Sequence, residues 1–202
     1  MRQLLLPLLA ALLLGFSGAV HADITTYTTT LSGAKEAPNS SPATGTATVV
    51  INDTANTMAL QIDFSGLVAP TTAAHIHCCT PAPNTGTVGV ATTTPYFAGF
   101  PIGVTASTYS MPFDLLAAST YNAAFVTAHG GTLTLAEADF LTGLASGSAY
   151  FNIHNATYPA GELRGFLSVA PIPESGHLAM LAVGLLGLAG VRHWRGAAGL
   201  AR

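Results

Sequence analysis

Short segments in which apolar and polar side chains alternate constrain the fold of this chain more than any other feature. In TMALQIDFSGL, residues 57–67, Met58, Leu60, Ile62 and Phe64 alternate with polar or small residues. Side chains two apart on an extended strand share a face, so the segment predicts a half-buried β-strand. Segments rich in Thr, Val and aromatic residues predict further strands at residues 24–33, 45–52, 71–79, 103–113, 148–154 and 161–169.

Two segments break the strand pattern and indicate helices. In TLAEADFLTGLASG, residues 134–147, apolar residues recur at helical spacing, and Thr134 with Glu137 has the form of a capping box that starts a helix. Residues 119–131 predict a second, shorter helix. The sequence therefore predicts an all-β domain: an antiparallel β-sandwich with a short helical insertion before the last hairpin, plus an apolar helix near the C-terminus.

The N-terminal end indicates export. Arg2 is followed by the apolar run LLLPLLAALLLGF and then by the small residues of SGAVHA, which end at Ala22. This order is typical of a secretory signal peptide. We therefore assign residues 1–22 to the signal peptide and residues 23–170 to the folded domain.

The C-terminal end, residues 171–202, predicts a membrane-directed segment. Its apolar run, residues 178–191, would form a helix of about 21 Å. That is shorter than the ~30 Å hydrocarbon core, so a spanning helix would need tilt or local thinning. Arg192, Arg195 and Arg202 follow, and the positive-inside rule places them in the cytoplasm. A permanent single-span anchor is one interpretation.

A second interpretation comes from a resemblance. A Pro-Glu motif, a short apolar helix and terminal arginines together resemble the PEP-CTERM sorting signal of Gram-negative bacteria. The motif here reads Pro173, Glu174, Ser175, with Ser where the family usually has a second Pro. The resemblance implies transient passage through the inner membrane and cleavage near the motif by an exosortase-type enzyme. The protein would then reside at the cell surface, in the outer membrane or in the extracellular matrix.

Charge excludes several classes of partner. Between residues 23 and 170, Lys35 and Arg164 are the only cations and stand against eight acidic side chains, a formal charge of −6. Nucleic acids and anionic lipid surfaces need clustered Lys and Arg, so we exclude them as partners of this domain. No nucleophile–base motif or phosphate-binding loop is present in the sequence, which favours a non-enzymatic protein.

The segment HIHCC contains the candidate metal ligands. On a strand, His75 and His77 share a face, and such a pair is a good start for a zinc or copper site. His154, in the last predicted hairpin, is the third candidate, and His129 is a more distant one. In the alternative interpretation, the histidines are structural and hydrogen-bond to the backbone or to Glu162.

The adjacent Cys78 and Cys79 are the only cysteines of the chain. Export would bring them into an oxidising compartment, where disulfides form. They could close a vicinal disulfide, stay reduced, bind metal or pair between molecules. We expect the vicinal disulfide, which would impose a tight turn at the end of the strand.

Glu162 and Arg164, in GELRG, are the remaining pair of interest. Two apart on a predicted strand, they would lie on one face and form an ion pair. Alternatively, Glu162 accepts a hydrogen bond from His154 or His75 and so orients that histidine toward the metal.

Four further motifs occur in order along the chain: LSGAKEAP (31–38), ATGTATVVI (43–51), IDFSGLVAPTTAAHIH (62–77) and AYFNIHNATYPAGELRGFL (149–167). Together they resemble the CHRD domain, a module first defined in the animal protein chordin. The resemblance implies a β-sandwich-like extracellular module. The cysteines stand where the family usually has Gly-Pro after HIH, and the segment 80–131 is longer than in the simplest members.

Two functions follow as hypotheses. The first is an exported, non-enzymatic surface or matrix module, with an exosortase-type enzyme and extracellular polysaccharide as candidate partners. The second is a metal-binding redox protein that uses zinc or copper on the His-x-His strand.

Overall fold

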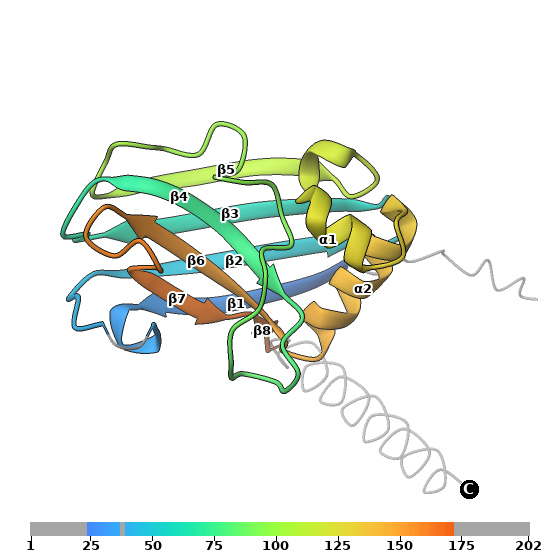
Figure 1. Cartoon of the computed structure of the whole chain (residues 1–202), viewed down its shortest axis with the longest axis horizontal. Helices are drawn as coiled ribbons and strands as arrows, with labels where there is room; N and C mark the ends of the chain where they lie inside the picture. Colours follow the sequence, from blue (N-terminus) through green and yellow to red (C-terminus); the bar gives the residue numbers. More distant parts are fainter. Residues whose placement is uncertain (1–23, 37–38, 172–202) are drawn as a thin grey trace, which may run out of the picture.

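A computed structural model describes residues 24–36 and 39–171 of the 202-residue chain (Figure 1). The expected signal peptide, the sorting motif at Pro173, Glu174 and Ser175, and the apolar run 178–191 lie outside the described residues. Within the described part, no helix has the length and apolar character that membrane crossing requires.

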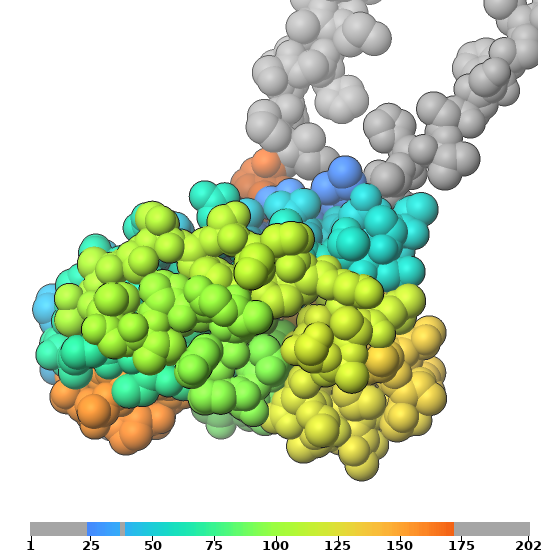
Figure 2. Space-filling model, turned by 90° about the horizontal axis from the view of Figure 1, so that it is seen from above, coloured from blue at the N-terminus to red at the C-terminus, as the bar shows by residue number. Residues whose placement is uncertain are grey.

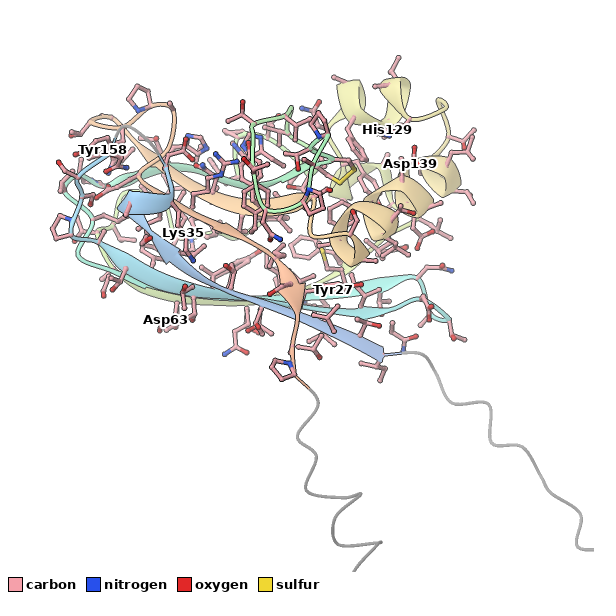
Figure 3. The ribbon with its side chains drawn as sticks, turned by 90° about the horizontal axis from the view of Figure 1, so that it is seen from below. Tyr27, Lys35, Asp63, His129, Asp139 and Tyr158 are labelled. Carbon is pink, nitrogen blue, oxygen red and sulfur yellow. A yellow bond between two sulfur atoms is a disulfide. The ribbon has the colours of Figure 1, made fainter. Side chains whose placement is uncertain are left out.

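Antiparallel pairing joins the eight described strands into one sheet. The order is β4-β6-β7-β1-β2-β3-β5, and β8 pairs with β1 beside β7. The sheet curls so that its two halves face each other, and Figure 3 shows the two layers from the side. The predicted all-β, sandwich-like fold is confirmed. The strands are β1 (Ile24–Ser32), β2 (Thr44–Asn52), β3 (Thr57–Ser65), β4 (Thr71–Cys78), β5 (Ser107–Asp114), β6 (Ala149–Asn155), β7 (Leu163–Phe166) and β8 (Ser168–Val169).

The core lies between the two halves of the sheet. The four alternating apolar residues of β3 are all buried, with exposed fractions of 0–1 %. Burial of each such side chain contributes roughly 1.5–3 kcal/mol relative to exposure. From the opposite half, Ile76 and Phe151 point into the same core, and the Phe97 ring stacks on Phe151 with 6.2 Å between centroids. The other face of β4 and β6 is therefore turned away from the core.

The helical insertion lies between β5 and β6, as predicted, and occupies one end of the sandwich (Figure 1). Its start was predicted wrongly. The N-cap of the longer helix is Thr132, whose hydroxyl accepts a hydrogen bond from the Leu135 amide at 3.3 Å. Thr134 is already helical, and Glu137 is buried instead of closing a capping box. The helices are η1 (Gly33–Lys35), η2 (Ala118–Thr120), α1 (Ala123–Ala128) and α2 (Leu133–Ala145).

The long loop, residues 79–106, folds back over the free edge of β4. The Ala91 amide donates to the Ile76 carbonyl at 2.9 Å, and Ala74 forms a β-bridge with Tyr96. Figure 2 shows residues of this loop and of β5 as a continuous surface that adjoins the helical end. The loop therefore covers a strand edge and brings its own carbonyl groups close to β4.

The end of β4 packs directly against α2. Cys78 and Cys79 form a vicinal disulfide with an S–S distance of 2.05 Å. A methyl group added at Gly143, in the last turn of α2, would clash with Cys78 Sγ and lie 2.7 Å from Cys79 Sγ. Glycine is needed here because the sulfur atoms occupy the space of a side chain.

Replacing Gly143 by Ala tests this packing. In a free helix the change would stabilise by roughly 1 kcal/mol. Here we expect a loss of about 1–3 kcal/mol in the free energy of unfolding, because the methyl group overpacks the disulfide. Thr142→Ala, at the exposed neighbouring position, is the matched control and should be neutral or stabilising. Chemical denaturation of the oxidised proteins measures both, and a more stable Gly143→Ala variant would contradict the packing described.

Candidate metal centre

The three histidines predicted as ligands lie together. His75 and His77 are on the outer face of β4, and His154 is on the same face of β6, because Ala73 is paired with His154 and His75 with Asn152. One ring nitrogen from each histidine lies within 4.8 Å of the others. The cluster is therefore made by two strands that are neighbours in the sheet but far apart in the sequence.

The Nδ1 atoms of all three rings are held by backbone carbonyls. The distances are 3.3 Å from His75 to Pro95 O, 2.7 Å from His77 to Val88 O, and 3.0 Å from His154 to Pro159 O. A carbonyl oxygen only accepts hydrogen bonds, so each Nδ1 must carry the proton and donate it. The neutral rings then present an unprotonated Nε2, the form that binds metal.

The three Nε2 atoms are the ring nitrogens that are not held by carbonyl groups. Those of His75 and His154 are 2.9 Å apart, and that of His77 is buried without a hydrogen-bond partner. Two of these nitrogen atoms are therefore in direct contact and the third belongs to the same cluster, where a cation would relieve the repulsion between their lone pairs. Nitrogen ligands at Zn–N distances of about 2.0–2.1 Å in a tetrahedron are roughly 3.3 Å apart. The distances in the cluster bracket this value, so the residues fit an ion after small ring movements.

Burial keeps the three rings uncharged. It lowers the pKa of His75 to about 3, with further contributions from neighbouring His154 and His77. It lowers the pKa of His77 to about 4, and it also lowers the pKa of His154. At neutral pH all three are neutral imidazoles, and proton competition for Nε2 is weak.

Tyr150 and Arg164 support the cluster from β6 and β7. The His77 ring stacks on Tyr150 at 4.5 Å with an interplanar angle of 9°, and the Arg164 guanidinium lies 3.7 Å from the centre of the Tyr150 ring. Arg164 also donates to the Gly86 carbonyl in the long loop. The same cation thus holds the aromatic neighbour of His77 and the loop whose carbonyls orient the histidines.

The expected ion pair of Arg164 with Glu162 is not formed. Arg164 Nη1 instead lies 3.8 Å from a carboxylate oxygen of Glu36, which also accepts from the Asn152 amide at 2.7 Å. Glu36 was missed because it lies far away in sequence and outside any strand. Burial raises the pKa of Glu36, while nearby Arg164 and the Asn152 hydrogen bond lower it.

Glu162 contributes to the fold and not to the histidine cluster. It is completely buried and accepts hydrogen bonds from Ser41 Oγ at 2.5 Å, from the Val68 amide at 2.9 Å and from the Asn155 side chain. It has no hydrogen bond to a histidine among the described residues. The expectation differed because β7 begins only at Leu163, so Glu162 precedes the strand and does not follow its alternation.

Neither cysteine joins the cluster, nor does His129. Cys78 is on the core face of β4, opposite His75 and His77, and is tied to Cys79. His129 lies at the end of α1, with Nδ1 2.8 Å from Asp139 Oδ2. The set offered to a metal is therefore three imidazoles without a thiolate. Such a set suits zinc or copper and leaves a coordination position for another ligand.

Comparison with known proteins defines the family. The model of the CHRD domain matches residues 27–167, a span that includes both strands of the cluster and the long loop. No curated protein sequence matches the chain. Because the match covers well over half of the chain, the protein belongs to the CHRD domain family.

Proposed function

We propose that the protein is an exported CHRD module that binds one zinc or copper ion through His75, His77 and His154. The observation that supports this most strongly is that carbonyl groups hold all three Nδ1 atoms, which leaves the three Nε2 atoms as the free nitrogens of a cluster with ligand atoms within 4.8 Å of one another. A bound zinc ion would supply a structural cross-link or a Lewis acid, whereas copper would supply one-electron chemistry.

A purely structural hydrogen-bond network explains the cluster less well. The contact between His75 Nε2 and His154 Nε2 could become a hydrogen bond only if one of these atoms carried a proton. Since both Nδ1 atoms already donate to carbonyls, that ring would be a buried cation. Burial and the neighbouring rings hold the pKa of His75 at about 3, which disfavours the cation at neutral pH.

Limited access favours a non-enzymatic role for the ion. His75 and His154 are only 7 % and 9 % exposed, and the carbonyl groups of the long loop lie against His75 and His77. A substrate at the ion would have to displace this covering. A metal that joins β4 and β6 beneath the loop would instead stabilise the domain by binding only its folded form.

Export to the cell surface is the second part of the proposal. The two ends of the domain are neighbours, because Tyr27 pairs with Val169 and the Ala170 amide donates to Thr26 O at 2.8 Å. If a membrane segment follows the domain, the chain would therefore pass into it from a point beside β1. We propose delivery by an exosortase-type enzyme to the surface or matrix of a Gram-negative bacterium, where extracellular polysaccharide is a candidate partner.

Metal content tests the first part. The full chain is produced with its expected signal peptide, so that it folds in an oxidising compartment. We expect elemental analysis and native mass spectrometry to find one zinc or copper ion per chain. Separate His75→Ala, His77→Ala and His154→Ala changes should abolish stoichiometric binding, because each removes one ligand. His129→Ala is the matched control and should retain the ion. Thermal unfolding identifies the variants that remain folded. Wild-type protein that stays free of metal after incubation with both ions would refute the proposal.

Intact mass tests the sorting part. In a Gram-negative host with the sorting enzyme, the surface or released form should lack Arg192, Arg195 and Arg202, because cleavage falls near the motif. Replacement of Pro173 and Glu174 by Ala should leave these arginines in place. A surface form of the wild-type chain that still carries all three would exclude exosortase processing and favour a permanent anchor.

A further inference from the structure

A second chemical site lies at the helical end of the domain. A pocket of about 300 Å³ is lined by residues that include Cys79, His129, Asp139 and Gly143. Figure 3 shows the disulfide close to the labelled His129 and Asp139. The metal ligands are on the opposite face of β4, so this pocket is separate from the metal centre and does not depend on it.

The two sulfur atoms differ in access. Cys78 is 2 % exposed and belongs to the core, whereas Cys79 is half-buried and lines the pocket. Cys79 Sγ lies 3.5 Å from the Asp139 carbonyl oxygen. A nucleophile that enters the pocket therefore meets Cys79 first, and Cys78 is the sulfur that would leave.

A histidine–aspartate pair lines the same pocket. His129 Nδ1 lies 2.8 Å from Asp139 Oδ2, and the ring packs on Phe125 with 4.1 Å between centroids. Because the carboxylate can only accept a hydrogen bond from Nδ1–H, Nε2 is the ring nitrogen left to take a proton from a thiol. A base oriented by a third group is the arrangement that activates thiols and hydroxyls in nucleophilic reactions.

We propose that this pocket is a thiol-binding site at which an external dithiol reduces the Cys78–Cys79 disulfide. His129 accepts the proton of one thiol, and the thiolate attacks Cys79 Sγ. A bond forms between the incoming sulfur and Cys79, the Cys78–Cys79 bond breaks, and its electron pair goes to Cys78. The second thiolate then attacks the incoming sulfur and releases Cys79. The dithiol leaves as a disulfide, and its two protons end on Cys78 and Cys79.

The rate of reduction tests this assignment. The oxidised full chain is treated with dithiothreitol, and free thiols are counted over time by maleimide labelling and intact mass. At pH 7, His129→Asn should reduce about tenfold more slowly than wild type, because few incoming thiols ionise without a base. Asp139→Asn should slow the reaction in the same direction. Leu135→Ala, at a solvent-facing position of α2, is the matched control and should react at the wild-type rate.

The pH profile separates proton transfer from a structural effect. The titratable groups placed against His129 are Asp139 from α2 and, after reduction, Cys79 at the end of β4. At pH 9.5, above the ordinary cysteine pKa of about 8.5, thiols ionise largely without help, so all variants should react at similar rates. Equal rates at pH 7, or the same deficit at both pH values, would overturn the proposal.

The position of attack gives an independent check. With glutathione as a monothiol, the mixed disulfide trapped by acid should map to Cys79 by peptide mass spectrometry. An adduct on Cys78 would overturn the proposal, whatever the rates of the variants. If His129→Asn does not fold, Asp139→Asn and the adduct map still decide the question.

Discussion

The hydrogen bonds between histidine Nδ1 atoms and backbone carbonyls determine what the outer face of β4 and β6 can do. Three imidazoles placed side by side would ordinarily rotate or exchange tautomers until their nitrogen atoms complemented one another. Here the carbonyl oxygens of Val88 and Pro95 in the long loop and of Pro159 after β6 each accept a hydrogen bond from one ring. The remaining nitrogen atoms must then meet as acceptors, and a metal ion satisfies three acceptors at once.

This arrangement depends on a loop that is itself held at several points. The guanidinium of Arg164 donates to Gly86 O and lies over Tyr150, which in turn packs against His77. On the other side, Phe97 fixes the loop to the core through its contact with Phe151. The ligands therefore rest on two strands of a packed sheet, and their orientation depends on a loop anchored by both charge and apolar burial.

Because side chains alternate between the two faces of β4, each face carries different functional groups. His75 and His77 point outward to the proposed metal, while Cys78 points into the core and forms the disulfide against α2. The compact segment HIHCC is thus not one site. It contributes two ligands to the proposed metal centre on one face and, at its end, a disulfide whose accessible sulfur lines a separate pocket.

Side-chain periodicity explains which features could be predicted from sequence. The period of two in β3 and β4 predicted the strands and placed His75 and His77 on one face, and the last hairpin made His154 a reasonable third candidate. The sequence could not predict the partners of Arg164 and Glu162, because their positions depend on where β7 begins. It also gave no indication of the carbonyl acceptors, since a backbone group looks the same at every residue.

The protonation state of the cluster provides the most direct test of the central claim. Long-range ¹⁵N–¹H correlation spectra of the metal-free protein distinguish the two neutral tautomers of each histidine. The geometry predicts that His75, His77 and His154 all carry their proton on Nδ1, and that addition of zinc shifts the Nε2 resonances of these three rings. A proton on Nε2 of any of the three, with no response to zinc, would contradict the account of a preorganised metal centre.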